Sequence, residues 1–218
     1  MKRVNVASSM MVGVMMVATG NVQADVGVGV RMSSLGAGVE LGKSVTDFFT
    51  VRVGLNKYST SQSETIDNIN YDTNLDLQST SLMLDWNPFG GSFHLTAGYL
   101  NSGNEISVAA TPNGLVTVGN TTVNVNPGEL VLNGKIKLGS GPYLGLGWGN
   151  VPASGLGFVL EAGVVQMGTP DVSLSYIDNT GTLGLVQADI DQEIANMKSD
   201  LNQYDTYPVI AIGISYGF

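Results

Sequence analysis

The last eleven residues, Pro208–Phe218, have a pattern that few folds can accommodate. Small residues alternate there with large apolar ones, which are Ile210, Ile212, Ile214, Tyr216 and Phe218. Because the side chains of a strand alternate between two faces, this strand has one apolar face and one face of small residues. Such a strand, ending the chain on an aromatic residue, is typical of a bacterial outer-membrane barrel, where one face contacts lipid and the other a packed or wet lumen.

The first 24 residues predict a secretory signal peptide. Lys2 and Arg3 form a basic start, residues 4–19 are mostly apolar, and Val22-Gln23-Ala24 is a small-residue cleavage pattern. A transmembrane helix is the competing interpretation, but polar residues interrupt the apolar stretch, which is shorter than the roughly 20 residues that a span requires. We therefore expect a signal peptide over 1–24 and one outer-membrane β-barrel domain over 25–218.

Charge and composition exclude several function classes. The chain has 9 basic and 18 acidic residues, so loss of Lys2 and Arg3 with the signal peptide leaves 7 basic residues and a net charge of −11. Nucleic acid is excluded as a partner because its phosphates need a basic face. The sequence contains no cysteine, which excludes disulfides, thiol catalysis and cysteine-ligated zinc.

Alternating hydrophobicity predicts eight antiparallel strands. The apolar phase changes between Met32 and Ala37, and a slip of one residue would turn every side chain to the wrong face, so we expect two strands separated by a turn here. Merging them would leave an odd number of strands and an open edge, whose backbone groups stay unpaired in lipid. The expected strands are 26–32, 36–43, 49–55, a segment ending at Trp86, 93–99, 130–148, 156–176 and 208–218. The expected fold class is thus an all-β, eight-stranded antiparallel transmembrane β-barrel.

An even strand count places both chain ends on the periplasmic side, with short periplasmic turns and long external loops. The expected turns are 43–47, 87–91 and 150–154, and the expected external loops are 61–72, 104–128 and 177–206. The reversed parity of Leu75 and Leu77 predicts a bulge near Gln78–Ser79. Turn signals at Asn113-Gly114 and Gly119-Asn120 predict a small hairpin inside the 104–128 insert.

One segment of the last external loop has a helical period. Its apolar residues are Val186, Ile190, Ile194, Met197 and Leu201, which predict a short helix over about 187–203. The polar face of this helix is acidic, whereas a helix on a membrane surface is normally basic. We therefore expect the helix to pack on the barrel mouth.

Aromatic residues are expected to form two girdles at the membrane interfaces. The periplasmic girdle would consist of Trp86, Phe89, Phe93, Trp148, Phe158, Tyr216 and Phe218. The external girdle would consist of Tyr58, Tyr71, Tyr99, Tyr176, Tyr204 and Tyr207.

Several sequence blocks resemble a known group of small eight-stranded outer-membrane barrels, which includes the carbapenem-associated ornithine-uptake porin type and uncharacterised relatives. The matching blocks are 84–99 (LDWNPFGGSFHLTAGY), 142–150 (PYLGLGWGN), 163–173 and the acidic helical stretch leading into 207–218. With the 35–56 hairpin, they cover most of the mature chain, and the 104–128 insert departs from the group. The resemblance implies the barrel fold and an outer-membrane location, and it carries over no catalytic residue.

The inward faces of the expected strands carry ionisable residues. These are Arg31, Glu40, Arg52, Asp85, His94 and Glu161, together with Lys135 and Lys137. Charges in a narrow barrel need partners because their desolvation is costly. Two interpretations stay open, a lumenal plug in which the arginines pair with the carboxylates and a polar constriction that passes small cationic or zwitterionic solutes. Eight strands leave an interior just filled by side chains, which favours the plug, whereas the inward glycines free volume.

The sequence thus predicts an integral protein of the bacterial outer membrane. It is either a narrow passive channel for small polar or zwitterionic solutes or a structural, surface-interacting barrel with a plugged lumen. An outer-membrane enzyme is a third alternative, but His94 is the only histidine and no G-x-S-x-G nucleophile elbow is present. We expect no catalytic residue, metal or cofactor. The expected partners are outer-membrane lipid, lipopolysaccharide, small solutes and the barrel-assembly machinery, which would bind the strand ending at Phe218, and the protein is expected to be a monomer.

Overall fold

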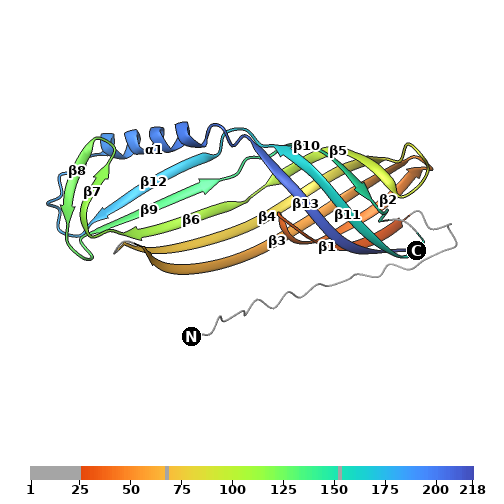
Figure 1. The fold of residues 1–218 in the computed structure, drawn as a ribbon, viewed down its shortest axis with the longest axis horizontal. Helices are drawn as coiled ribbons and strands as arrows, with labels where there is room; N and C mark the ends of the chain where they lie inside the picture. The colour runs from red at the N-terminus through yellow and green to blue at the C-terminus, as the bar shows by residue number, and fades with distance from the viewer. Residues whose placement is uncertain (1–25, 67–68, 152–153) are drawn as a thin grey trace.

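The computed structural model describes residues 26–66, 69–151 and 154–218, so the expected signal peptide lies outside the described residues. The described residues form thirteen strands and one helix, arranged as an elongated barrel with an open extension (Figure 1). In chain order the elements are β1 (Val26–Ser33), β2 (Gly36–Thr46), β3 (Phe49–Ile66), β4 (Ile69–Trp86), β5 (Phe93–Ser102), β6 (Glu105–Thr111), β7 (Gly114–Val118), β8 (Thr121–Val125), β9 (Leu130–Lys137), β10 (Gly141–Trp148), β11 (Gly155–Gln166), β12 (Asp171–Asp178), α1 (Gln187–Leu201) and β13 (Thr206–Gly217).

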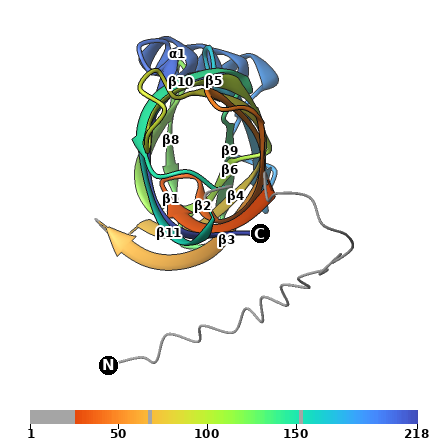
Figure 2. The ribbon, with the colours of Figure 1, turned by 90° about the vertical axis from the view of Figure 1, so that its right-hand side faces the viewer.

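Antiparallel pairing closes the sheet into a ring at one end of the molecule. The pairings run from β5 through β4, β3, β2, β1, β13, β11 and β10 and return to β5. Figure 2 looks down this ring. The first and last strands meet along the whole of β1, from Gly27 opposite Gly217 to Ser33 opposite Ala211. The two ends of the described chain therefore lie side by side.

The barrel is not closed evenly along its length. Strand β4 pairs with β5 over Ser79–Trp86 and then changes its neighbour to β6 over Asn70–Asp76. From β6 the sheet continues through β9 to β12, and it does not return to β13. The single strands expected over 130–148 and 156–176 are each two strands, β9 with β10 and β11 with β12, and each pair is interrupted at a short break. Two of the eight expected strands are thus divided, while the other six are single strands of the closed ring.

Around the ring, large apolar side chains point outward and small or polar side chains point inward. On β13, Ile212 is 64% exposed, whereas its neighbour Ala211 is 2% exposed. On β3, Val53 is exposed and Arg52 is buried. This alternation confirms the in–out assignment made from the hydrophobic period.

Strands β3 and β4 form a ribbon of 18 residues each, which extends far beyond the ring. The expected loop over 61–72 is wrong, because the two strands pair in unbroken register up to Ile66 opposite Ile69. Side-chain hydrogen bonds cross the ribbon, for example from Ser61 Oγ to Asn74 Oδ1 at 2.7 Å. Both faces of this segment lack a full apolar stripe, so the hydrophobic period gave no strand signal there.

The expected bulge at Gln78–Ser79 is also absent, since the β3–β4 register shows no shift at this point. The apolar residues change parity because the outer face of the sheet changes from apolar to polar, while the strand itself stays regular. Below this level the outward face carries Leu82 and Leu84, and above it the outward face carries Asn74 and Asp76, while Leu75 lies on the inner face. One strand of unbroken register therefore passes from an apolar to a polar exterior.

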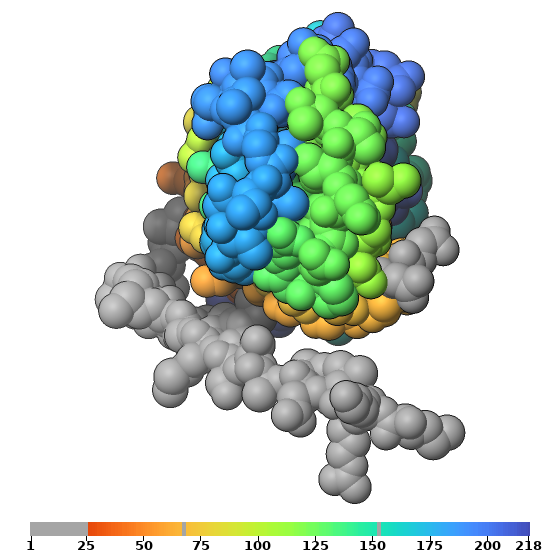
Figure 3. Space-filling model, turned by 90° about the vertical axis from the view of Figure 1, so that its left-hand side faces the viewer, coloured from red at the N-terminus to blue at the C-terminus, as the bar shows by residue number. Residues whose placement is uncertain are grey.

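A helical cap covers the inner face of the open extension. Helix α1 and the hairpin β7–β8 pack on β9 and β12 around a buried apolar cluster that includes Val118, Val125, Leu130 and Ile190. Figure 3 shows the hairpin (green) beside the chain that leads into α1 (blue) at this end. The expected helix and the expected hairpin are confirmed, although residues 105–111 of the insert belong to the main sheet as β6.

The cap is held by polar contacts as well. Asp189 accepts hydrogen bonds from Thr121 Oγ1 at 2.7 Å and from the backbone N–H of Val186 at 3.0 Å. Glu193 accepts one from the backbone N–H of Gly119 at 3.0 Å. Among the helices that the structure describes, none has the length and hydropathy to cross a bilayer.

The aromatic residues follow the two ends of the ring, with exceptions. Trp86, Trp148 and Tyr216 are exposed at the end of the ring where Val26 and Phe218 lie. At the other end Tyr99 is exposed on the outward face of β5. Tyr58, Tyr71 and Tyr207 have the inward parity of β3, β4 and β13, and Tyr176 is turned inward, where its hydroxyl donates to the carbonyl of Leu185 at 2.8 Å. The assignment of these four tyrosines to an outward girdle is therefore wrong.

Candidate functional site

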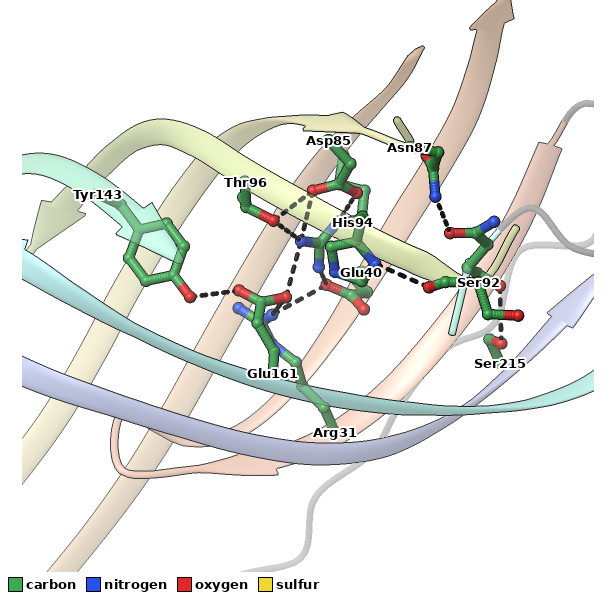
Figure 4. Close-up of polar contacts among 12 residues, drawn as sticks. Arg31, Glu40, Asp85, Asn87, Ser92, His94, Thr96, Tyr143, Glu161 and Ser215 are labelled. Carbon is green, nitrogen blue, oxygen red and sulfur yellow. Dashed lines mark hydrogen bonds and ion pairs between the residues drawn. The ribbon is translucent and has the colours of Figure 1, made fainter. Parts of the chain in front are cut away.

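Five charged side chains from five strands meet inside the ring (Figure 4). They are Arg31 of β1, Glu40 of β2, Arg52 of β3, Asp85 of β4 and Glu161 of β11. Each lies on the inward parity of its own strand, and the register places each charged residue of β1–β4 two residues from the position opposite the next one. All five are buried, with exposed fractions of 2–6%. We call this group the lumen network.

Arg52 is the centre of the lumen network. Its Nε and Nη2 donate to the two carboxylate oxygens of Asp85 at 2.5 and 2.8 Å, a bidentate geometry. Its Nη1 donates to Glu40 Oε2 at 3.0 Å, and its Nη2 also donates to Glu161 Oε2 at 2.7 Å. One guanidinium thus contacts all three carboxylates, which a lysine ammonium could not do with the same planar fork.

The remaining members complete the network around the carboxylates. Arg31 Nη1 lies 3.1 Å from Glu40 Oε2 and 3.9 Å from Glu161 Oε2. The Tyr143 hydroxyl donates to Glu161 Oε1 at 2.6 Å. The Thr96 hydroxyl donates to Asp85 Oδ1 at 2.7 Å. Sequence reasoning missed Tyr143 and Thr96, although both have the inward parity of their strands.

The formal charges of the lumen network do not balance. Two arginines face three carboxylates, so the formal count leaves one negative charge over among buried side chains. Each ion would lose several kcal/mol of hydration on its own, and the short contacts and added hydroxyl donors offset this cost. Arg31 Nε is buried and has no hydrogen-bond partner among the described residues.

His94 lies inside the ring but outside the lumen network. Its ring is 1% exposed, and its Nδ1 lies 3.4 Å from the carbonyl oxygen of Ser92. Its Nε2 is buried with no partner in the described chain. The nearby Gly147 leaves room for the imidazole, because a Cβ there would meet Nε2 at 2.4 Å. The ring therefore fills space below the network and contacts none of its charges.

Lys135 and Lys137 are not in the lumen, and this expectation is wrong. Both lie on the outward polar face of β9, where Lys135 Nζ is 2.7 Å from Glu105 Oε1 and 45% of its side chain is exposed. The prediction treats residues 130–148 as one strand, in which all odd residues point inward. The break between β9 and β10 shifts the phase, so odd residues point outward on β9 and inward on β10.

An apolar layer lies on the lumen network. Leu35, Met83, Leu100, Tyr143, Val165 and Val209 form a buried cluster, and their exposed fractions are 1–4%. Tyr143 belongs to both layers, since its ring packs in the apolar cluster and its hydroxyl binds Glu161. The side chains that fill this part of the ring are therefore almost completely buried.

The chemistry of the site is that of a packed ionic core. A nucleophile next to a base is required for covalent catalysis, and His94 Nε2 has no hydroxyl partner among the described residues. Groups of three or more histidine or acidic side chains placed to hold a metal ion are likewise absent from the described part of the chain. The arginines occupy both carboxylate oxygens of Asp85 and one oxygen each of Glu40 and Glu161.

The chain shares its fold with crystal structures of two outer-membrane proteins from Acinetobacter baumannii. CarO has 20% sequence identity and a TM-score of 0.59, covering 88% of this chain and 97% of CarO. CarO2 has 22% identity and a TM-score of 0.61, covering 90% of this chain and 100% of CarO2. No protein-family model and no curated protein matches the chain. The resemblance of the sequence to the carbapenem-associated barrel type is therefore confirmed at the level of the fold.

Proposed function

We propose that the protein is an outer-membrane β-barrel with a closed lumen, which is monomeric within its own membrane and presents the cap and the β3–β4 ribbon at the cell surface. The eight strands of the ring would cross the lipid, with the turns after β2 and β4 in the periplasm. Its partners in the membrane would be lipid, lipopolysaccharide and, during assembly, the barrel-assembly machinery at the strand ending in Phe218.

The outward face of the ring supports the membrane location. Exposed apolar side chains cover it, and on β13 they span Pro208 to Tyr216, close to the 9–11 residues of a tilted membrane strand. Exposed tryptophans and tyrosines border this surface, as in membrane barrels. A water-soluble protein rarely exposes so large an apolar surface.

The burial of the lumen network carries the proposal of a closed lumen. Arg52, Glu161 and Tyr143 have exposed fractions of only 1–2%, whereas side chains that line an aqueous pore are in contact with water. The apolar layer lies on top of them and contains no charged group. The function supported best is therefore a structural or surface-interacting barrel.

A narrow passive channel is the second candidate. The surplus carboxylate of the lumen network favours it, because a site with net negative charge attracts small cationic or zwitterionic solutes once water enters. Passage would require the network and the apolar layer to rearrange. We assign no catalytic role to either layer.

Single-channel recording in planar bilayers tests both candidates. The refolded wild type should show no discrete openings, while a general porin in the same lipid serves as the positive control. A Lys135→Ala variant, altered on the polar exterior, should match the wild type. Discrete openings whose size or selectivity changes in Arg52→Ala or Glu161→Ala variants would overturn the closed lumen in favour of the channel.

A further inference from the structure

Strand β3 has a free edge from Tyr58 to Ile66. Strand β2 pairs with β3 only as far as Ala37 opposite Lys57, and in the described chain β4 is the only strand that pairs with β3 beyond that point. Alternate backbone N–H and C=O groups on the β2 side of this segment therefore point to solvent. Figure 1 shows this part of β3 at the border of the sheet.

The free edge carries few of the features that normally protect an edge strand. Natural sheets blunt their edges with proline, lysine or a bulge. Residues 58–66 contain no proline and no lysine, their one charged residue is Glu64, and the pairing with β4 has no register shift. The outward side chains Ser59 and Ser61 are exposed and polar, so the free edge lies in water beyond the apolar surface of the ring.

We propose that this edge binds the same edge of a second copy as an antiparallel strand pair, with Gln62 on the two-fold axis. The sequence is self-complementary in this register. It places Tyr58 opposite Ile66, Ser59 opposite Thr65, Thr60 opposite Glu64 and Ser61 opposite Ser63. No like charges face each other, and an aromatic residue meets a β-branched residue at both ends, which stabilises cross-strand pairs. A two-fold interface of this kind uses the same patch on both copies.

The direction of the strands decides where the second copy lies. Copies inserted in one membrane have their β3 strands pointing the same way, whereas antiparallel pairing needs opposite directions. The pairing therefore joins copies on two facing surfaces, and this step rests on the proposed membrane orientation. Nine residues span about 30 Å, so the surfaces must carry little sugar between them. One strand pair is a small interface, and many copies in parallel are needed for firm contact.

Cysteine cross-linking in detergent tests the pairing without relying on the membrane. The chain has no cysteine, so each introduced thiol is unique. A Gln62→Cys variant should form a disulfide-linked dimer under mild oxidation, because residues on the axis lie within disulfide distance. Ser59→Cys alone should stay monomeric, whereas a mixture of Ser59→Cys and Thr65→Cys should give a dimer.

Charge substitution provides an independent readout on facing membranes. Proteoliposomes free of lipopolysaccharide should cluster with the wild type. A Ser61→Lys/Ser63→Lys double variant places lysines opposite each other and should abolish clustering and the Gln62→Cys dimer. Mixing it with liposomes that carry Ser61→Glu/Ser63→Glu should restore clustering.

Two results would overturn the proposal. One is a Gln62→Cys variant that folds but remains monomeric. The other is a Ser59→Cys variant that dimerises by itself as readily as the mixture with Thr65→Cys, which would indicate parallel or random contact. Cross-linking in detergent without membrane insertion would instead contradict only the proposed location.

Discussion

The change in stability on replacing Arg52 by methionine reports whether the lumen network is buried or hydrated. The substitution keeps a long side chain but removes the guanidinium that contacts Asp85, Glu40 and Glu161 at 2.5–3.0 Å. Three buried carboxylates would then face Arg31 alone. Breaking a buried ion pair by removing one partner costs about 3–5 kcal/mol, because the other charge stays buried without compensation. In a water-filled lumen the same loss would be about 0.2–1 kcal/mol, as for exposed pairs.

Urea unfolding of the refolded protein in lipid vesicles, followed by tryptophan fluorescence, gives the free energy of unfolding. The matched control is Lys135→Met, which breaks a pair of similar length, 2.7 Å, on the exposed exterior and should cost below about 1 kcal/mol. Arg52→Lys should fall between the two, since it keeps the charge and loses the fork. If Arg52→Met and Lys135→Met destabilised the barrel equally, the lumen network would be hydrated and the proposed closed lumen would be refuted.

Three further changes test other parts of the molecule. Leu146→Arg, on the outward face, should cost roughly 2–4 kcal/mol near the bilayer centre, and unchanged stability in the same unfolding assay would show that lipid is not the solvent there. Gly163→Ala places a Cβ 2.3 Å from the Tyr143 hydroxyl and should cost about 1–3 kcal/mol, whereas Gly134→Ala, whose nearest atom is at 3.9 Å, should be tolerated; equal effects would refute the packing argument. Hydrogen bonds from Thr121 and the Val186 backbone lower the pKa of Asp189 in the folded state. The Asp189 carboxylate therefore stabilises the cap at pH values above its unfolded pKa of about 3.9, and this stabilisation is lost as the pH falls through the lower folded pKa. Hydrogen exchange should then show α1 opening in acid, and an Asp189→Asn variant should lack that acid-dependent change.

The ring of the barrel was predictable because lipid imposes a strict rule on every second residue. Ile212 and Leu146 could be placed outward, and Arg52 and Glu161 inward, from parity alone. The split at Met32–Ala37 was predictable for the same reason, since β1 and β2 each keep one phase.

The extension was less predictable because its environment changes within single strands. Leu75 and Leu84 lie on opposite faces of one regular strand, and only the three-dimensional structure shows that the exterior changes from apolar to polar between them. Lys135 was misplaced for a different reason, because the break between β9 and β10 shifts the phase, so that odd residues point outward on β9 and inward on β10. Tyr143 was missed because a single inward tyrosine among glycines gives no signal of its partner, Glu161, which is 18 residues away.

The pairing of β1 with β13 determines when the barrel can form. The backbone N–H of Phe218 donates to the carbonyl of Val26 at 3.0 Å, and β13 is the only strand that joins β1 to β11 in the described chain. Until β13 is in place, both of those neighbours keep open borders, so the ring cannot close before this strand joins it. The same proximity makes the molecule suited to circular permutation, because a short linker could join β13 to β1 and new ends could be opened in a surface connection without breaking the seam.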